Sequence, residues 1–334
     1  MKKNIFAVCD LEVDYAHNFM DYLNCKRSIP FEIQAFTSVE HLIKFAEKQR
    51  IEILLISDKA MCPQVKELDV GQLMILSEGV HPPELDQYPS VYKYQSSDHV
   101  IREVMACYGA DRDGSEPARI PKKTMEIFGV YSPLGRCLKT SFALTLGQIL
   151  ARDRAVLYIN LEEYAGFEEL LEKRYEHTLS DAMYYARQHN KNLAHKISGM
   201  IESIGNLDYI PPAESFEDIR TASLEEWNYL LDTIAFNSAY EVVILDAGDG
   251  VDGLFQLLDR CTRVFMPILT DVLSRAKLAQ AEKLMKTWKV LSGKFEKIKL
   301  PYYTFSGDGK GYVEQLVWSE LGDFVRTLLR KERE

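Results

Sequence analysis

The sequence predicts an α/β protein built from two doubly wound parallel sheets. Two observations support this class: apolar segments of strand length alternate with helical segments, and one polar stretch at residues 111–123 interrupts the alternation. Alternating strands and helices favour parallel sheets with helices on both faces. A chain of 334 residues is also long for a single core. We therefore expect domains at residues 1–110 and 124–334, joined by a linker at residues 111–123.

The first domain should contain five strands separated by helices. The expected strands are 4–9, 31–36, 51–56, 72–76 and 90–94, and the expected helices are 14–23, 39–47 and 99–107. The apolar strands and the short connections between them indicate a flavodoxin-like parallel sheet. Ligands of such sheets bind beyond the carboxyl ends of the strands.

Polar residues stand at the ends of four of these strands. Asp10 and Glu12 follow the first strand, Ser57 ends the third, Ser77 follows the fourth, and Lys93 lies in the fifth. In this pattern the domain resembles a response-regulator receiver domain. The resemblance implies that Asp10 and Glu12 are the family's acidic cluster and that Ser57 stands at the phosphoacceptor position. It likewise implies that Ser77 is the Ser or Thr after the fourth strand and Lys93 the Lys after the fifth.

The acceptor position carries no carboxylate, because the third strand ends in Ser57 and Asp58 follows one residue later. Side chains of successive strand residues point to opposite faces. We therefore expect a degenerate, unphosphorylated receiver in which Lys93 and Asp10 form a structural ion pair. The alternative is a strand that ends one residue later, which would put Asp58 at the acceptor position.

The polar stretch at residues 111–123, DRDGSEPARIPKK, has the composition of a linker. It contains Gly114, Pro117 and Pro121 and has no apolar periodicity. Glycine and proline in such a context disfavour regular elements. The second domain therefore begins near Lys123.

The second domain again alternates strands and helices. The expected strands are 126–132, 154–161, 207–210, 241–245, 263–268 and 299–303, and the expected helices include 142–150, 224–238, 273–291 and 317–329. The apolar stripe of the last helix is expected to pack on the core rather than on a membrane, since Glu320 and Asp323 interrupt any basic face.

The loop between the first strand and helix of this domain has the outline of a phosphate-binding loop. It comprises Pro133, Leu134, Gly135, Arg136, Cys137, Leu138, Lys139, Thr140 and Ser141. In such a loop the backbone amides surround phosphate oxygens, the Lys reaches the outer phosphates, and the Thr hydroxyl binds Mg²⁺. Against G-x-x-x-x-G-K-[ST], Pro133 and Leu138 replace the glycines. We expect the Leu138 side chain to compete with a phosphate for space.

Two further strand ends carry polar residues. Asp246 ends the apolar segment EVVILD, as does the carboxylate that holds Mg²⁺ through water in the Walker B pattern. Asn160 and Glu162 end the second strand, where Glu162 could orient an attacking water. A Lys at a helix N-terminus opposes the helix dipole, so Lys139 should meet a ligand or a neighbouring carboxylate such as Asp246.

These features together resemble the MinD/ParA superfamily of P-loop ATPases, whose loop is K-G-G-x-G-K-T. In that register Leu134 replaces the family's signature Lys, and Asn160-Leu161-Glu162 matches its D-x-D with one carboxylate lost. Asp246 and Gly248 match its D-x-x-x-G region loosely. The resemblance implies ATP and Mg²⁺ as ligands, and a homodimer.

A receiver-like domain ahead of a MinD-like domain is similar to the TadZ/CpaE group of pilus-assembly localisation proteins. The segments VYKYQSSDHVIREV, LYINLEEYAGF, LDYIPPAESFEDI and VVILDAGDGV lie where that group has similar ones. The resemblance covers nearly the whole chain. It implies an ATP-linked dimer at a cell pole that recruits secretion machinery.

The eroded loop sets the expected activity. The chain lacks the phosphoacceptor, the signature Lys and two loop glycines, so we expect a positioning or scaffolding protein that binds ATP and Mg²⁺ weakly or not at all. Losing one charge contact to the transition state can slow phosphoryl transfer by about three to five powers of ten. The alternative is an active MinD-type ATPase in which Arg136 and Glu162 substitute for the missing groups.

The charge of the chain disfavours nucleic acid as a partner. Residues 1–113 contain 12 Lys and Arg against 18 Asp and Glu, which leaves 28 against 32 for the remainder of a chain of net charge -10. Binding to a phosphate backbone requires a basic face. A chromosome or plasmid partition ATPase is the third hypothesis, and the acidic charge of both domains disfavours it.

No apolar run is long enough to cross a bilayer, and the charged N-terminus does not resemble a secretory signal, so we expect a cytoplasmic protein that reaches membranes only indirectly.

Overall fold

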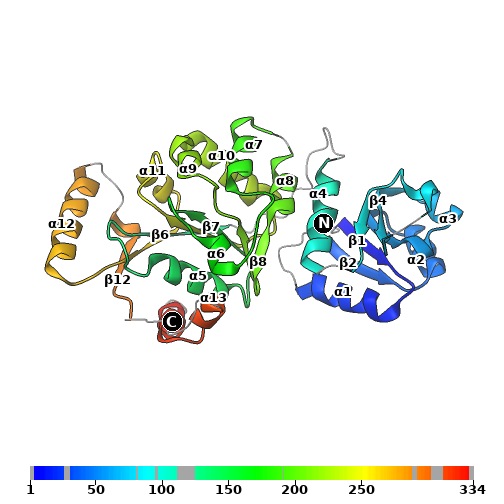
Figure 1. Ribbon diagram of the computed structural model, residues 1–334, viewed down its shortest axis with the longest axis horizontal. Coiled ribbons are helices and arrows are strands. Elements are labelled where there is room, and N and C mark those ends of the chain that lie inside the picture. Colours follow the sequence, from blue (N-terminus) through cyan, green and yellow to red (C-terminus); the bar gives the residue numbers. More distant parts are fainter. Residues whose placement is uncertain are drawn as a thin grey trace. The chain divides into compact units, whose positions relative to one another are not determined.

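The computed structural model describes residues 4–25, 31–79, 82–94, 97–110, 125–190, 192–287, 292–301 and 311–330. The chain divides into two compact units, each built on its own sheet (Figure 1). The predicted linker at residues 111–123, and residue 124 at the predicted start of the second domain, lie outside the described residues. Each unit is considered by itself below.

The first unit contains a five-stranded parallel sheet in the order β2-β1-β3-β4-β5. This is one of the common strand orders of open doubly wound sheets. Its strands are β1 Asn4–Cys9, β2 Phe31–Phe36, β3 Ile51–Ser57, β4 Val70–Ser77 and β5 Ser90–Tyr92. Its helices are α1 Val13–Cys25, α2 Val39–Ala46, α3 Pro63–Lys66 and α4 Ser97–Ala110, with short 3-10 turns at Asp58–Ala60 and Pro83–Leu85.

The central strand β3 explains why this sheet needs helices on both sides. Ile53 and Leu55 belong to the core on one face, whereas Leu54 and Ile56 belong to the core on the other face. All four side chains are fully buried. A continuous apolar run is typical of a parallel strand buried on both faces.

The second unit contains a seven-stranded sheet in the order β12-β11-β6-β10-β7-β9-β8, in which only the pair β8 and β9 is antiparallel among the described strands. Its strands are β6 Glu126–Tyr131, β7 Val156–Leu161, β8 Glu202–Ile204, β9 Leu207–Ile210, β10 Val242–Ala247, β11 Arg263–Pro267 and β12 Phe295–Ile298. Because β6, β10 and β7 are adjacent and parallel, their carboxyl ends meet at one edge. That edge collects the residues singled out in the sequence.

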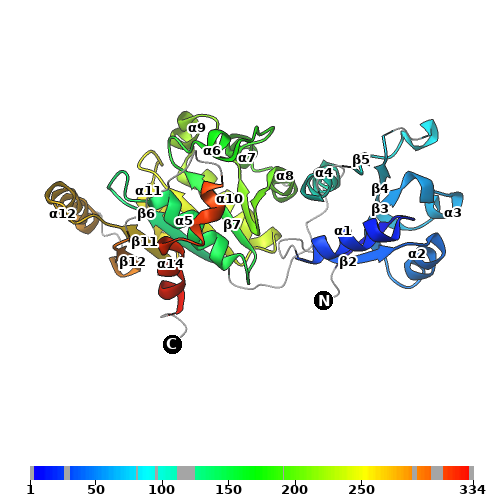
Figure 2. The same cartoon turned by 60° about the horizontal axis from the view of Figure 1, so that its bottom comes forward.

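Helices cover this sheet (Figure 2). They are α5 Lys139–Leu150, α6 Phe167–Leu171, α7 Leu179–Arg187, α9 Phe216–Thr221, α10 Leu224–Asn237, α11 Leu254–Asp259, α12 Val272–Thr287, α13 Tyr312–Leu316 and α14 Glu320–Arg330, with a 3-10 turn at Ser292–Lys294. Helix α8, Leu193–Met200, follows α7 in the chain, but its residues 194–199 are grouped with the first unit. Among the described residues, no helix has the length and apolar character needed to cross a membrane.

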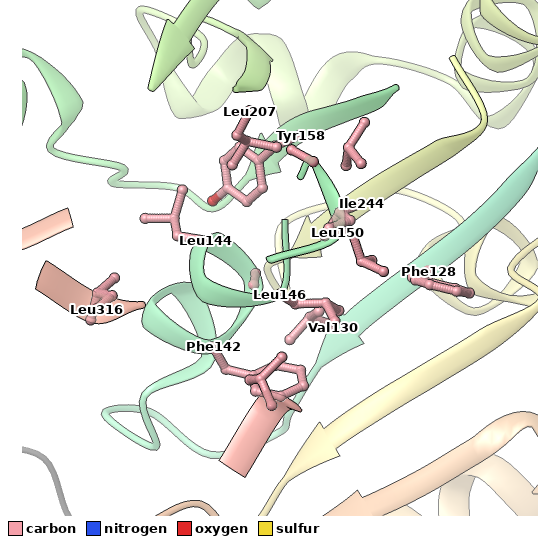
Figure 3. Close-up of a cluster of buried hydrophobic side chains, with 14 of the residues drawn as sticks. Phe128, Val130, Phe142, Leu144, Leu146, Leu150, Tyr158, Leu207, Ile244 and Leu316 are labelled. Carbon is pink, nitrogen blue, oxygen red and sulfur yellow. The ribbon is translucent and has the colours of Figure 1, made fainter. Parts of the chain in front are cut away.

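Helix α5 is the buried helix of this unit, and it enters directly from the loop after β6. Phe142, Leu144 and Leu146 lie in the core cluster together with Ile244 of β10 and Leu316 of α13 (Figure 3). Gly147 lets α5 approach the sheet, because a Cβ there would lie 2.9 Å from the side chain of Leu207. The buried face of α5 therefore packs closely on the sheet, and the helix begins at Lys139, directly after the loop.

Two sequence predictions for the end of the chain need correction. The last parallel strand among the described residues is β12, at Phe295–Ile298; of the predicted strand 299–303, residues 299–301 are not in a strand, and residues 302 and 303 lie outside the described residues. Of the predicted C-terminal apolar stripe, Leu321 and Val325 are fully buried, but Trp318 is 77% exposed and lies between α13 and α14 beside the guanidinium of Arg152. The antiparallel strand β8 was also missing from the prediction, and its three residues are too short for a clear pattern.

Candidate functional site

The loop between β6 and α5 has a backbone path that normally belongs to glycine. Arg136 has φ 57° and Leu138 has φ 62°, so both lie in the left-handed region. This conformation costs an L-residue roughly 1–2 kcal/mol. Positions 136 and 138 are those at which the K-G-G-x-G-K-T pattern has glycine. The loop therefore keeps its bends although the glycines are gone.

Hydrogen bonds within the loop fix its first half. The Ser132 hydroxyl donates to the Pro267 carbonyl at 2.7 Å and accepts from the Leu134 amide at 3.2 Å. The Cys137 thiol donates to the Leu134 carbonyl at 3.2 Å. Leu134, which stands at the signature-Lys position, is only 5% exposed. A buried leucine at this position has no charge with which to replace the signature Lys.

In the rest of the loop, some residues are exposed to solvent, whereas Ser141 contacts another helix. Gly135 and Arg136 are exposed, and nothing lies within 4 Å of where a Cβ of Gly135 would be. The Ser141 hydroxyl is 2.7 Å from the Tyr312 hydroxyl of α13. Ser141, a predicted nucleotide-binding residue, thus already has a partner outside the loop.

Lys139 is the first residue of α5, and its ammonium group is tied to the neighbouring strands. Nζ donates to the Ala247 carbonyl at 2.6 Å, forms an ion pair with Glu162, and lies 5.9 Å from the centre of the Tyr131 ring. The sequence named Asp246 as the neighbouring carboxylate. The structure shows an ion pair with Glu162 instead, whereas Asp246 is fully buried and accepts a hydrogen bond from Tyr158.

Asp246, at the end of β10, is fully buried. The Tyr158 hydroxyl donates to its Oδ2 at 2.9 Å, and Asn160 Nδ2 lies 3.4 Å from the same oxygen. Burial raises the pKa of Asp246 to about 6, with a further increase from the charge of Glu162, while Lys139 and the Thr140 hydroxyl oppose the shift. The protein thus holds a carboxylate where its charged form is disfavoured.

This burial predicts a stabilising substitution. A folded-state pKa of about 6 lies above the usual value of about 3.9 for aspartate, so this group's contribution to stability is full below about pH 4 and is lost as the pH rises through 6. Asp246→Asn should therefore stabilise the metal-free protein at pH 7 by up to about 3 kcal/mol, and by little at pH 4. Urea unfolding in EDTA at both pH values measures the difference.

The exposed Asp252 provides the control for this experiment. Asp252→Asn should leave the unfolding free energy unchanged at both pH values. An Asp246→Asn protein that is less stable than the parent at pH 7 would show that the buried carboxylate is stabilising, contrary to the expectation.

The residues around Asp246 fit a Mg²⁺ ion bound together with a phosphate. Asp246 Oδ1 is buried and has no hydrogen-bond partner of normal geometry among the described residues, and the Thr140 hydroxyl interacts with the same carboxylate. The described residues contain no cluster of three or more His, Cys, Asp or Glu that could hold a metal. Mg²⁺ suits this donor set, because it usually keeps several waters and uses one or two carboxylates plus substrate phosphates.

Several residues at this edge were not predicted. Glu163 packs against the turn after β10, where a Cβ on Gly248 or on Gly250 would lie 2.8 Å from its carboxylate oxygens. The Tyr131 hydroxyl donates to Asp249 at 3.0 Å. Tyr158 could have been found, since it lies two residues before Asn160 and a strand places both on one face. Asp249 and Glu163 lie in loops, which have no such periodicity.

A cavity of about 1000 Å³ opens beside the loop. Tyr131 and Pro133 line it together with residues of α11, α12 and the turn before α11. Lys139, Thr140 and Asp246 are not among its lining residues. The cavity is therefore a neighbour of the phosphate loop and not the phosphate site itself.

The predicted receiver pocket of the first unit is filled by an ion cluster. Lys93 Nζ lies 2.8 Å from Asp10, 3.1 Å from Glu12 and 3.4 Å from Glu78, and the Lys93 side chain is fully buried. Burial by itself would lower the pKa of Lys93, but its hydrogen bonds to Asp10 and Glu12 outweigh this effect and raise it. The predicted ion pair with Asp10 is thus present, and Glu78 is an additional partner.

The two serines of this pocket are buried, and each forms a hydrogen bond with a residue close to it in the sequence. The Ser57 hydroxyl donates to Asp58 at 3.5 Å, and the Ser77 hydroxyl accepts from the Gly79 amide at 3.1 Å. Strand β3 ends at Ser57, and Asp58 begins the 3-10 turn that follows. The strand therefore ends one residue later than the predicted 51–56, with Ser57 at its last position and Asp58 outside it.

No protein-family model matches the sequence, and no curated protein matches it. Three of the solved structures with a similar fold are an ATPase and two proteins with a bound ATP analog. A putative plasmid partition protein of Borrelia burgdorferi bound to AMPPNP is 15% identical, covering 63% of this chain and 100% of its own, with a TM-score of 0.44. A ParA family ATPase from Chlorobium tepidum is 20% identical, with coverages of 58% and 82% and a TM-score of 0.43.

The third is cobyrinic acid a,c-diamide synthase from Mycobacterium smegmatis with a bound ATP analog and magnesium. It is 14% identical, covering 63% of this chain and 97% of its own, with a TM-score of 0.44. Similarity at this level assigns neither a family nor a ligand to the chain, so its function is argued from the site.

Proposed function

We propose that residues 124–334 form a MinD/ParA-like nucleotide switch that binds Mg²⁺-ATP weakly and hydrolyses it slowly or not at all. One observation carries this proposal: the loop before α5 keeps left-handed bends at Arg136 and Leu138, although both residues are strained there. A fold that needed only a connection between β6 and α5 would gain by relaxing these bends. Phosphate binding at the N-terminus of α5 is a function that requires them.

In this proposal Lys139 leaves Glu162 for the outer phosphates, Thr140 and Asp246 hold the Mg²⁺, and the amides of residues 135–141 surround the phosphates. The bound ion would supply positive charge against the phosphate oxygens. The Lys139–Glu162 ion pair must break when nucleotide binds. That competition, together with the Leu138 side chain, makes binding weak.

The wider role we propose follows the resemblance to TadZ/CpaE proteins. Residues 1–110 would be a receiver-derived domain of flavodoxin-like fold, joined by the linker at residues 111–123 to the nucleotide switch. The buried Lys93 cluster supports a domain that no longer uses an acyl phosphate. The whole protein would form a homodimer, remain in the cytoplasm at a cell pole, and position pilus or secretion machinery.

The second candidate is an active ATPase, which the position of Glu162 beside Lys139 favours. Phosphate release from ATP in Mg²⁺ distinguishes the two. For the switch, we expect release at the background rate, about three or more powers of ten below a competent relative, and no further loss in Glu162→Gln. Turnover that disappears in both Glu162→Gln and Lys139→Ala would establish the ATPase instead.

A further inference from the structure

The side chain of Tyr158 combines a buried position with a polar task. It lies in the middle of β7 within the core cluster (Figure 3), and its ring stacks on Phe167 at 5.9 Å. Its hydroxyl nevertheless forms two hydrogen bonds, donating to Asp246 Oδ2 at 2.9 Å and accepting from Asn160 Nδ2 at 2.8 Å. A buried hydroxyl needs such partners, so the arrangement of all three groups is fixed.

These bonds act on only one oxygen of Asp246. Oδ2 receives the Tyr158 hydroxyl and lies within 3.4 Å of Asn160 Nδ2, whereas the buried Oδ1 lacks a hydrogen bond of normal geometry among the described residues. The carboxylate cannot rotate without breaking the bond to Tyr158. Oδ1 is thereby left as the oxygen without a hydrogen bond of normal geometry, in a carboxylate that also interacts with Thr140 at the N-terminus of α5.

The side-chain amide of Asn160 is fixed by two hydrogen bonds, one through its donor and one through its acceptor. Nδ2 donates to the Tyr158 hydroxyl, and Oδ1 accepts from the Glu162 amide at 2.9 Å. A carboxylate at this position could not donate to Tyr158 and would add a second negative charge beside Asp246. The amide therefore suits a site with one buried carboxylate.

We propose that Tyr158 and Asn160 are positioning residues that aim Asp246 Oδ1 at a divalent cation bound together with the nucleotide. This inference rests on the proposed function. Neither residue touches the cation; each acts through the carboxylate. Removing a partner that orients a metal ligand usually lowers metal affinity by about 10- to 100-fold.

A matched control is provided by Tyr209, which pairs with Tyr158 in the register of β7 and β9 and is equally buried. Its hydroxyl lies 3.0 Å from the Tyr175 hydroxyl. Tyr158→Phe and Tyr209→Phe therefore remove the same atom from the same layer of the core. Only the first should affect the cation.

The test compares ADP affinity with Mg²⁺ and with EDTA, measured by calorimetry on the full chain, and adds Mn²⁺ binding in the presence of ADP followed by electron paramagnetic resonance. We expect Mg²⁺ to strengthen ADP binding in the parent, Tyr158→Phe to reduce that gain and the Mn²⁺ affinity by about tenfold or more, and Tyr209→Phe to keep both within about twofold of the parent. Asn160→Ala should reduce the Mg²⁺ gain in the same direction.

The two possible failures differ. A parent that binds no nucleotide removes the proposed function and this inference with it. A parent that binds nucleotide with a Mg²⁺ gain that Tyr158→Phe and Asn160→Ala both preserve overturns this inference alone. Circular dichroism shows whether each variant is folded, and Asn160→Ala decides the matter if Tyr158→Phe is not.

Discussion

Replacing Lys93 with methionine should destabilise the first unit by about 3–5 kcal/mol, which is the usual effect of removing one member of a buried ion pair. The substitution keeps the length and the apolar stem of the side chain. It leaves Asp10, whose side chain is 2% exposed, without the cation 2.8 Å away. Most domains are stable by only 5–15 kcal/mol, so the loss is large for a unit of this size.

The effect is measured on the full chain by hydrogen exchange, followed in peptides from β1 and β3. Lys59→Met is the control, because Lys59 pairs with Glu78 but is 60% exposed, and exposed pairs contribute little. Protection should fall in Lys93→Met and remain in Lys59→Met. Equal protection in both variants would mean that the cluster is not what holds this unit together.

The same experiment bears on the origin of the first unit. In the receiver-derived domain that we propose, the ammonium group of Lys93 lies among the carboxylates of Asp10, Glu12 and Glu78. Since Ser57 cannot become an acyl phosphate, the charge balance of the pocket is permanent. We therefore expect the unit to have one stable state rather than two.

Most strands could be predicted from the sequence because buried parallel strands are continuous apolar runs. β1, β2 and β9 begin and end at the predicted residues, and β3 extends one residue further. The prediction failed at residues 299–301, where an apolar composition suggested a strand. Residues 299–303 contain an apolar run, but Pro301 has no amide to donate to a neighbouring strand. The actual strand, FEKI, alternates and is only partly buried.

The candidate site was predicted in outline but not in its contacts. Lys139 and Thr140 were predicted from the phosphate-loop pattern, and Asp246 and Glu162 from their places at the ends of apolar strands. Which carboxylate meets Lys139 depends on how far each side chain reaches, and this is a tertiary property. The left-handed conformation of Leu138 could not be inferred either, because leucine normally avoids it. Glycine in a sequence indicates where a left-handed bend can occur. When another residue replaces that glycine, the bend can no longer be predicted from the sequence.

The conformation of Leu138 changes the meaning of the eroded motif. From the sequence alone, the outline of the loop was expected, with the Leu138 side chain competing with a phosphate for space. The structure adds that the bends are kept by residues other than glycine: Arg136 and Leu138 both lie in the left-handed region, and Leu138, half-buried, is the N-cap of α5. Left-handed conformations of Arg136 and Leu138 cost free energy, and their retention supports a function for the loop.

The most direct measurement is calorimetric titration of ATP and Mg²⁺ into the full chain, with Lys139→Ala beside it. The parent should bind ATP in the submillimolar range, and Lys139→Ala should weaken binding by about a hundredfold, or about 2.8 kcal/mol, because it removes the charge that contacts the outer phosphates. Binding heat in the parent that is lost in the variant is the result the account predicts. No heat at millimolar ATP in the parent, or equal affinity in both proteins, would contradict it.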